Sequence, residues 1–81
     1  MPKPEEPLPA FDVILVAVGS KKIHAIKEVR ALTGRSMIEG KDFIESLPRV
    51  LVTNVSWDRA VEIIDRFTLI EASASFRDHS P

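Results

Sequence analysis

The chain has 81 residues, a net charge of −1 and no cysteine, which predicts a single small domain without disulfides or thiolate chemistry. Its near-neutral charge gives no overall attraction to nucleic acid. No apolar run approaches the length needed to span a bilayer, so we expect a cytoplasmic domain without a membrane partner.

The chain begins with a proline-rich segment and a strand. Proline lacks a backbone donor and restricts the residue before it, so residues 1–10 predict an extended arm or linker. Residues 11–18, FDVILVAV, are rich in β-branched residues and end at Gly19, which predicts a strand. Apolar side chains occupy both alternating sets of positions, and this is typical of a central strand.

Two helices are predicted next. The first is capped by Ser20, runs to about Thr33 and ends at Gly34, because glycine readily takes the left-handed conformation that ends helices. The second covers residues 37–47, where apolar side chains keep the helical period and Pro48 follows.

The last third of the chain predicts a strand, a helix and a strand. Residues 50–53 are short and β-branched, and Ser56 is a good N-cap for a helix over residues 57–69. Residues 72–77 alternate small apolar residues with serine, as an edge strand does. Residues 78–81 are expected to be a frayed tail.

The order of these elements, β-α-α-β-α-β, predicts an α+β domain over residues 11–77. A right-handed crossover through the third helix makes the second and third strands parallel. With the first strand inserted between them and antiparallel to both, the sheet order is 2-1-3. The three helices then form a second layer on one face of the sheet.

The first predicted helix carries two stripes of side chains. Ala25, Val29 and Leu32 form a stripe suited to the core. Ile23, Ile26, Lys27 and Arg30 fall at i, i+3, i+4 and i+7 and form a mixed basic and apolar stripe. Because one apolar face is enough to hold a helix in a small domain, the mixed stripe is expected to meet a partner.

Four segments carry a family resemblance: FDVIL, KKIHAIKEVRALTG, EGKDFIESLP and VSWDRA. Through them, residues 11–77 resemble, without a gap, the C-terminal domain of the bacterial large-subunit ribosomal stalk protein. The Ile-Lys-x-Val-Arg of residues 26–30 and the Lys-Asp-x-x-Glu-Ser-x-Pro of residues 41–48 are specific when found together.

The resemblance implies that the domain recruits translational GTPases, of the elongation factor G and Tu type, during protein synthesis. It places the contact surface on the first two helices. The matching positions of this chain are Lys22, Ile23, Ile26, Lys27, Arg30, Glu39 and Lys41.

The chain departs from the family in three places. The family's dimerising domain is missing, so the chain is either an excised fragment or a free-standing relative. The arm is proline-rich where the family's hinge is rich in alanine and glycine, and this favours the free-standing relative. The turn that is usually Gly-Leu-Gly-Leu-Lys is Gly-Arg-Ser-Met-Ile at residues 34–38, and Ser36 cannot take a positive φ as cheaply as glycine. Glu71 stands where a glycine is usual before the last strand.

Additional apolar residues predict a second contact, such as a homodimer, because exposed apolar patches mark protein contacts. Val16 stands where the family often has lysine, on the sheet face away from the helices. With Ile14 and Val18, Val16 forms an apolar row in the first strand. A second apolar stripe, on the third helix, consists of Trp57, Val61 and Ile64. Alternatively, the proline arm or repacked helices cover these apolar residues.

The sequence predicts no enzyme, cofactor or metal site. His24 has no second ligand three or four residues later, and no serine lies in a nucleophile motif. Two alternative functions remain: a private protein partner without a ribosome role, and weak nucleic-acid binding by the basic stripe, against which the lack of stacking aromatics argues. A likeness to the Clp protease adaptor rests on fold analogy alone.

Overall fold

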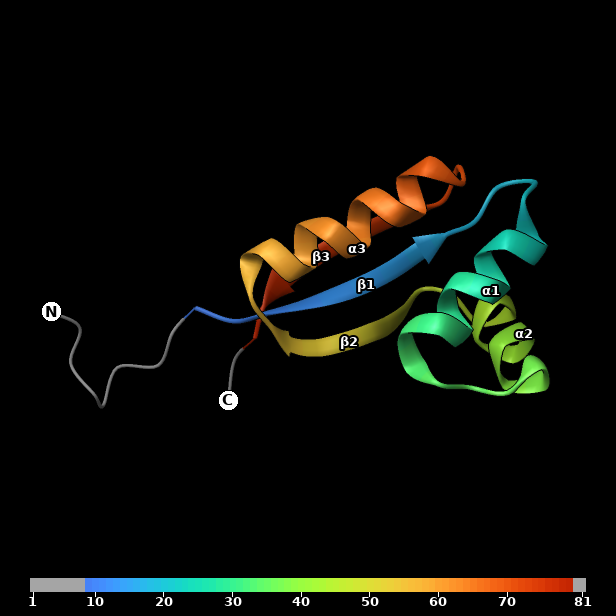
Figure 1. Cartoon of the computed structure of the whole chain (residues 1–81), viewed down its shortest axis with the longest axis horizontal. Helices are drawn as coiled ribbons and strands as arrows, with labels where there is room; N and C mark the ends of the chain where they lie inside the picture. The colour runs from blue at the N-terminus through green and yellow to red at the C-terminus, as the bar shows by residue number, and fades with distance from the viewer. Residues whose placement is uncertain (1–8, 80–81) are drawn as a thin grey trace, which may run out of the picture.

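The computed structural model describes residues 9–79. Six elements follow one another in the predicted order (Figure 1). They are β1 (Phe11–Ala17), α1 (Lys22–Thr33), α2 (Met37–Glu45), β2 (Arg49–Val55), α3 (Trp57–Leu69) and β3 (Ser73–Asp78). Most of the predicted proline arm lies outside the described residues.

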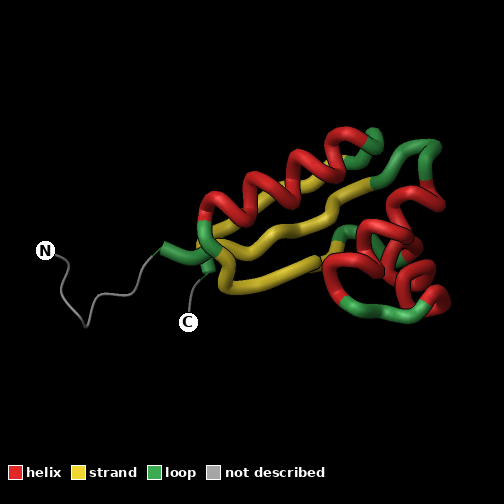
Figure 2. The backbone as a smooth tube through the Cα atoms, viewed as in Figure 1, coloured by secondary structure: helices red, strands yellow, loops and turns green. Residues whose placement is uncertain are grey.

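The three strands form one sheet in the order β2-β1-β3, and the central strand is antiparallel to both neighbours (Figure 2). Ile14 pairs with Val50 on β2 and with Ser75 on β3. The predicted α+β class and the 2-1-3 order are therefore confirmed. Each pairing contains register shifts, one of them between Leu15 and Ala17 in the β1–β3 ladder.

The helices are arranged unequally around the sheet. Figure 1 shows α3 running along the sheet, whereas α1 and α2 pack together near the end where β1 finishes and β2 begins. All six elements but β3 contribute fully buried or nearly buried apolar side chains to one core. Its largest fully buried members are Phe43, Phe67, Leu15, Ile63, Val13 and Val29.

Two of the three helix starts are capped by serine side chains. The Ser56 hydroxyl accepts a hydrogen bond from the Arg59 amide at 3.2 Å, as predicted for α3. The Ser20 cap is wrong: the N-cap of α1 is Lys21, whose side chain makes no capping bond. Gly34 ends α1 with a φ of 71°, in the left-handed conformation expected of it.

Ser36 is the N-cap of α2 and forms a capping box with Glu39. Its hydroxyl accepts from the Glu39 amide at 3.2 Å, and its own amide donates to the Glu39 carboxylate at 3.0 Å. Ser36 has a φ of −71°. The positive φ expected at a position where the family has glycine is therefore not required here. Ser36 therefore supplies a helix cap at this turn.

Several boundaries differ from the prediction; strand β1, for example, ends at Ala17 rather than at residue 18. Helix α2 ends at Glu45, two residues early, where the Ser46 hydroxyl donates to the Asp42 carbonyl at 2.8 Å and terminates the turn. Strand β2 is longer than predicted. Strand β3 runs to Asp78, and the His79 amide donates to the Ala10 carbonyl at 2.9 Å, so pairing extends into the predicted tail.

The turn before β3 holds Glu71 with a φ of 62°, in the left-handed region that favours glycine. Gly19 lies against this turn, and a Cβ on the glycine would come within 2.9 Å of the Glu71 carbonyl oxygen. The Glu71 carboxylate pairs with Lys21 at 3.4 Å. These contacts fasten the start of α1 to the start of β3.

Candidate functional site

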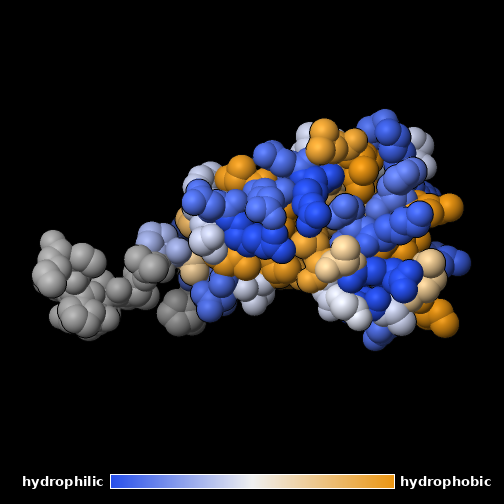
Figure 3. Space-filling view, viewed as in Figure 1, coloured by the Kyte–Doolittle hydropathy of each residue, from blue (hydrophilic) through white to orange (hydrophobic). Residues whose placement is uncertain are grey.

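The predicted partner surface lies where α1 and α2 meet. Figure 3 shows apolar side chains protruding among charged ones at this end of the molecule. Ile23 is 67% exposed, and Lys22, Lys27 and Arg30 are exposed beside it on α1. Ile26 is different, because it is partly buried and packs against the core.

The position of Ile26 follows from the close approach of the two helices. Gly40 is buried, and a Cβ built on it would lie 3.2 Å from Ile26 Cγ2 and 3.1 Å from Arg30 Cγ. The missing side chain lets α2 rest directly on α1. The predicted stripe is thus divided into an outer part, with Ile23 and Lys27, and an inner part that contacts α2.

On α2 the exposed side chains include two that the sequence reasoning did not select. Ile38 is 74% exposed and Met37 is 51% exposed, next to the predicted residues Glu39 and Lys41. The backbone amide and hydroxyl of Ser36 lower the pKa of Glu39 below its usual value, and the nearby Arg35 charge adds to this effect. Glu39 therefore stabilises the start of α2 as well as lying on its surface.

The basic side chains of this surface are not neutralised by the domain itself. Among residues 9–79, none of Lys22, Lys27 and Lys41 forms an ion pair. Arg30 likewise has no ion pair there, and its Nε donates weakly to the Arg35 carbonyl at 3.4 Å. A local positive charge therefore exists in a chain of almost zero net charge.

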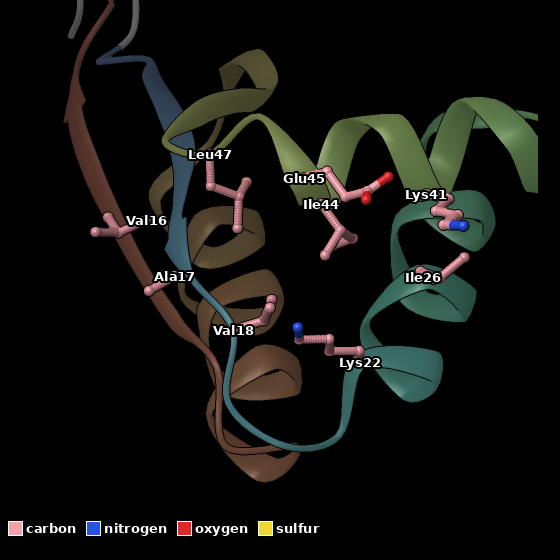
Figure 4. Close-up of a pocket in the computed structure, with 9 residues that line it drawn as sticks. All are labelled: Val16, Ala17, Val18, Lys22, Ile26, Lys41, Ile44, Glu45 and Leu47. Carbon is pink, nitrogen blue, oxygen red and sulfur yellow. The ribbon is translucent and has the colours of Figure 1, made fainter.

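A groove of about 690 Å³ opens beside this surface, between the end of β1, the start of α1 and the end of α2. Figure 4 shows Val18, Ile44 and Leu47 pointing into a common space, with the Lys22 ammonium group at its mouth. The full lining is Val16, Ala17, Val18, Lys22, Ile26, Lys41, Ile44, Glu45 and Leu47. The sequence prediction missed this groove, although it selected three of the lining residues for partner binding.

Comparisons with known proteins identify the family of the chain. The family described as the ribosomal protein L7/L12 C-terminal domain matches residues 11–76. This chain belongs to that family. The large ribosomal subunit protein bL12 of Desulfotalea psychrophila is 45% identical over 67 residues, which are 83% of this chain and 54% of that protein. The bL12 protein of Thermoanaerobacter pseudethanolicus is 42% identical over 74 residues, which are 91% of this chain and 59% of that protein.

The chain spans about half the length of these L7/L12 relatives. Both relatives are named as ribosomal proteins and neither as an enzyme. Within the described residues, no helix is both long and apolar enough to cross a membrane. No group of three or more histidine, cysteine or acidic side chains is gathered there in a way that could hold a metal ion.

The turn between α1 and α2, where this chain departs from the usual L7/L12 sequence, has a structural role. The guanidinium carbon of Arg35 lies 5.0 Å from the centre of the Phe43 ring, and that of Arg49 lies 4.7 Å from it. Guanidinium groups are attracted to aromatic faces. Arg35 is partly buried here and covers the core, so its charge is not simply added to the outer surface.

The residues selected for self-association do not form continuous patches. Val16 is 43% exposed, but Ile14 and Val18 are partly buried, and Val18 packs against the core. Figure 4 shows Val16 and Val18 on different sides of the chain. The expectation that both face the outer side of the sheet is wrong, because the register shift after Leu15 interrupts the alternation.

On α3, the three selected residues also separate. Ile64 and Val61 are partly buried, and Ile64 packs against the core. Trp57 is 45% exposed and belongs to an aromatic cluster that the sequence prediction missed. Its ring centre lies 5.1 Å from that of Phe11 and 4.8 Å from that of Phe76, both in edge-to-face geometry.

Asp12 was also missed, although it is the one charged side chain buried among the described residues. It accepts hydrogen bonds from the Asn54 amide at 3.1 Å and from Arg77 Nε at 3.0 Å, and it lies 2.7 Å from His79 Nδ1. Burial raises the pKa of Asp12, but these partners outweigh burial and lower it below the usual value. The carboxylate links β1 to both neighbouring strands at the end opposite the groove.

Proposed function

We propose that this domain works in the cytoplasm as a ribosomal stalk domain that recruits a translational GTPase, of the elongation factor G or Tu type. Membership of the L7/L12 C-terminal domain family supports a place in translation. One observation supports the contact surface: the exposed basic groups of α1 lie beside an exposed isoleucine and have no ion pairs within residues 9–79. The proposed contacts are Lys22, Ile23, Ile26, Lys27, Arg30, Glu39 and Lys41.

The chemistry of this surface suits a brief encounter. Full burial of an isoleucine side chain stabilises a complex by about 1.5–3 kcal/mol. Exposed lysine and arginine side chains around it speed the approach of an acidic partner and fix its orientation more than they add affinity. A patch on two short helices is small, and small interfaces give weak complexes that exchange quickly. Rapid exchange is what successive factors at one site require.

An amide-shift titration with elongation factor G, at low and moderate salt, tests this proposal. We expect shifts at residues 23–30 and at Lys41, and a large loss of affinity in Lys27→Glu. The matched control is Arg59→Glu on α3, whose side chain pairs with Glu62 away from the proposed surface. Absence of shifts at high factor concentration would contradict the proposal, as would equal losses in the two variants.

The alternative of a private protein partner would use the same surface on α1 and α2. Co-purification with ribosomes would argue against that alternative. Weak nucleic-acid binding by α1 would instead show an affinity that falls steeply with salt, in proportion to the phosphates contacted. Titration with a short RNA over a range of salt concentrations separates it from protein binding.

A homodimer is the second candidate, and the exposure of Val16 and Trp57 favours it. The proposed contact set remains Ile14, Val16, Val18, Trp57, Val61 and Ile64, although only the two exposed members present large apolar surface. Light scattering at high protein concentration tests it. A monomeric mass there would contradict self-association.

A further inference from the structure

The groove between β1, α1 and α2 has an apolar floor that is already packed in place. Ile44 is only 7% exposed and belongs to the core, and Val18, Ile26 and Leu47 pack against that core. Its volume of about 690 Å³ falls within the range of roughly 300–1,000 Å³ that is typical of ligand sites. Side chains held by the core keep the shape of such a groove when nothing is bound.

The rim of the groove is polar and mainly positive. Lys22 and Lys41 line it together with one carboxylate, that of Glu45. Neither lysine has an ion pair within residues 9–79, so both ammonium groups are available to a partner. Figure 4 shows the Lys22 side chain reaching across the mouth toward Val18. An occupant that complements this arrangement has an apolar side chain for the floor and carboxylates for the rim.

We propose that the groove binds an acidic segment of a partner protein by taking up one or more of its apolar side chains. This inference rests on the proposed function, since Lys22, Ile26 and Lys41 belong both to the groove and to the proposed partner surface. It adds a second contact region, because Ile23, Lys27 and Arg30 are absent from the lining. Val18, Ile44 and Leu47 become contact residues that the sequence did not suggest.

Methyl-shift titrations of the whole chain with short synthetic peptides test the groove directly. One peptide alternates leucine with aspartate and glutamate, a second has serine in place of leucine, and a third has lysine in place of the acids. With the first peptide, we expect shifts in the methyl groups of Val18, Ile26, Ile44 and Leu47. The serine and lysine peptides should bind about tenfold or more weakly, because one loses apolar burial and the other charge complementarity.

Exposed rim residues give variants that leave the core intact. Lys41→Glu should weaken binding of the first peptide several-fold, whereas Glu45→Lys should strengthen it. Lys27→Glu lies outside the lining and should have a much smaller effect than Lys41→Glu. Leu47→Ala removes part of the floor and should weaken binding, with circular dichroism as the check on folding. Shifts confined to Ile23, or equal affinity for all three peptides, would overturn the inference.

Elongation factor G, titrated in parallel, distinguishes failure of the groove from failure of the proposed function. If the factor loses affinity in Lys27→Glu but not in folded Leu47→Ala, the groove inference fails and the proposed function stands. If the acidic peptide shifts the groove methyls while the factor does not bind, the proposed function fails. The groove then serves a different acidic partner.

Discussion

Gly40 of α2 lies so close to Ile26 of α1 that a Cβ built on the glycine would be 3.2 Å from the Ile26 Cγ2 atom. This approach holds the two helices that carry the proposed surface and places Ile26 in the groove lining. A glycine inside a helix costs about 1 kcal/mol relative to alanine. Its presence at the centre of a nine-residue helix is explained by the space that a side chain would occupy.

Gly40→Val should therefore destabilise the domain, by about 1–3 kcal/mol as overpacked substitutions do. Helix propensity alone predicts the opposite sign, because valine is a better helix former than glycine. Denaturant unfolding followed by circular dichroism measures the change. Ala31→Val on the exposed side of α1 is the control, and an equal or smaller loss in Gly40→Val would show that the contact is not tight.

The two serines that precede α1 and α2 give a second prediction. Ser36→Ala removes the hydroxyl that accepts from the Glu39 amide, and loss of such a cap costs about 1 kcal/mol. Ser20→Ala should cost almost nothing, because Ser20 is not the N-cap of α1. Thermal unfolding of the two variants compares them directly. A loss in Ser20→Ala as large as in Ser36→Ala would contradict the caps seen in the structure.

The elements could be predicted because hydrophobic periodicity and the positions of glycine and proline are local signals. The sheet order followed from the right-handed crossover expected between the second and third strands. The sequence also predicted that Ala25 and Val29 lie in the core. The cap at Ser20 failed because a serine before a helix is only a local preference, and here the contact between Gly19 and Glu71 holds the turn. Such local preferences are overridden where segments distant in the sequence are in contact.

The candidate site was only partly predictable for the same reason. The spacing of Ile23, Lys27 and Arg30 is a property of one helix and could be read from the sequence. The groove lining includes Val18, which follows the register shift after Leu15, and Leu47, which lies beyond the early end of α2. Neither the shift nor the early end has a signal in the order of apolar residues alone.

The aromatic cluster of Phe11, Trp57 and Phe76 should contribute to stability although two of its rings are about half exposed. Edge-to-face pairs contribute about 0.5–1.5 kcal/mol each beyond the area they bury. Trp57→Ala loses two such pairs and should destabilise by about 1–3 kcal/mol. The control is Leu69→Ala, a truncation of a side chain that is 79% exposed at the other end of α3. Similar losses in the two variants, measured by circular dichroism, would argue that the cluster adds nothing.

The buried carboxylate of Asp12 makes the free energy of unfolding depend on pH in the acid range. Arg77, His79 and the Asn54 amide lower its pKa below the ordinary value near 3.8, against the effect of burial. The unfolded chain therefore takes up the proton at a higher pH than the folded chain. The stability that Asp12 provides is complete above about pH 4 and is lost as the pH falls through the lower, folded pKa.

Unfolding of the protein and of Asp12→Asn at pH 7 and at pH 2.5 measures this contribution. We expect the variant to be less stable at pH 7 and the difference to shrink at pH 2.5, because the contribution of Asp12 decreases as the pH falls toward its lowered pKa. The variant keeps Glu39, whose pKa is also lowered, so the stability of the variant itself still falls at acid pH. Asp42→Asn controls for the loss of one negative charge, since the Asp42 carboxylate has no hydrogen bond or ion pair within residues 9–79. A difference between protein and Asp12→Asn that stayed constant with pH would mean that packing of Asp12, rather than its charge, holds the three strands together.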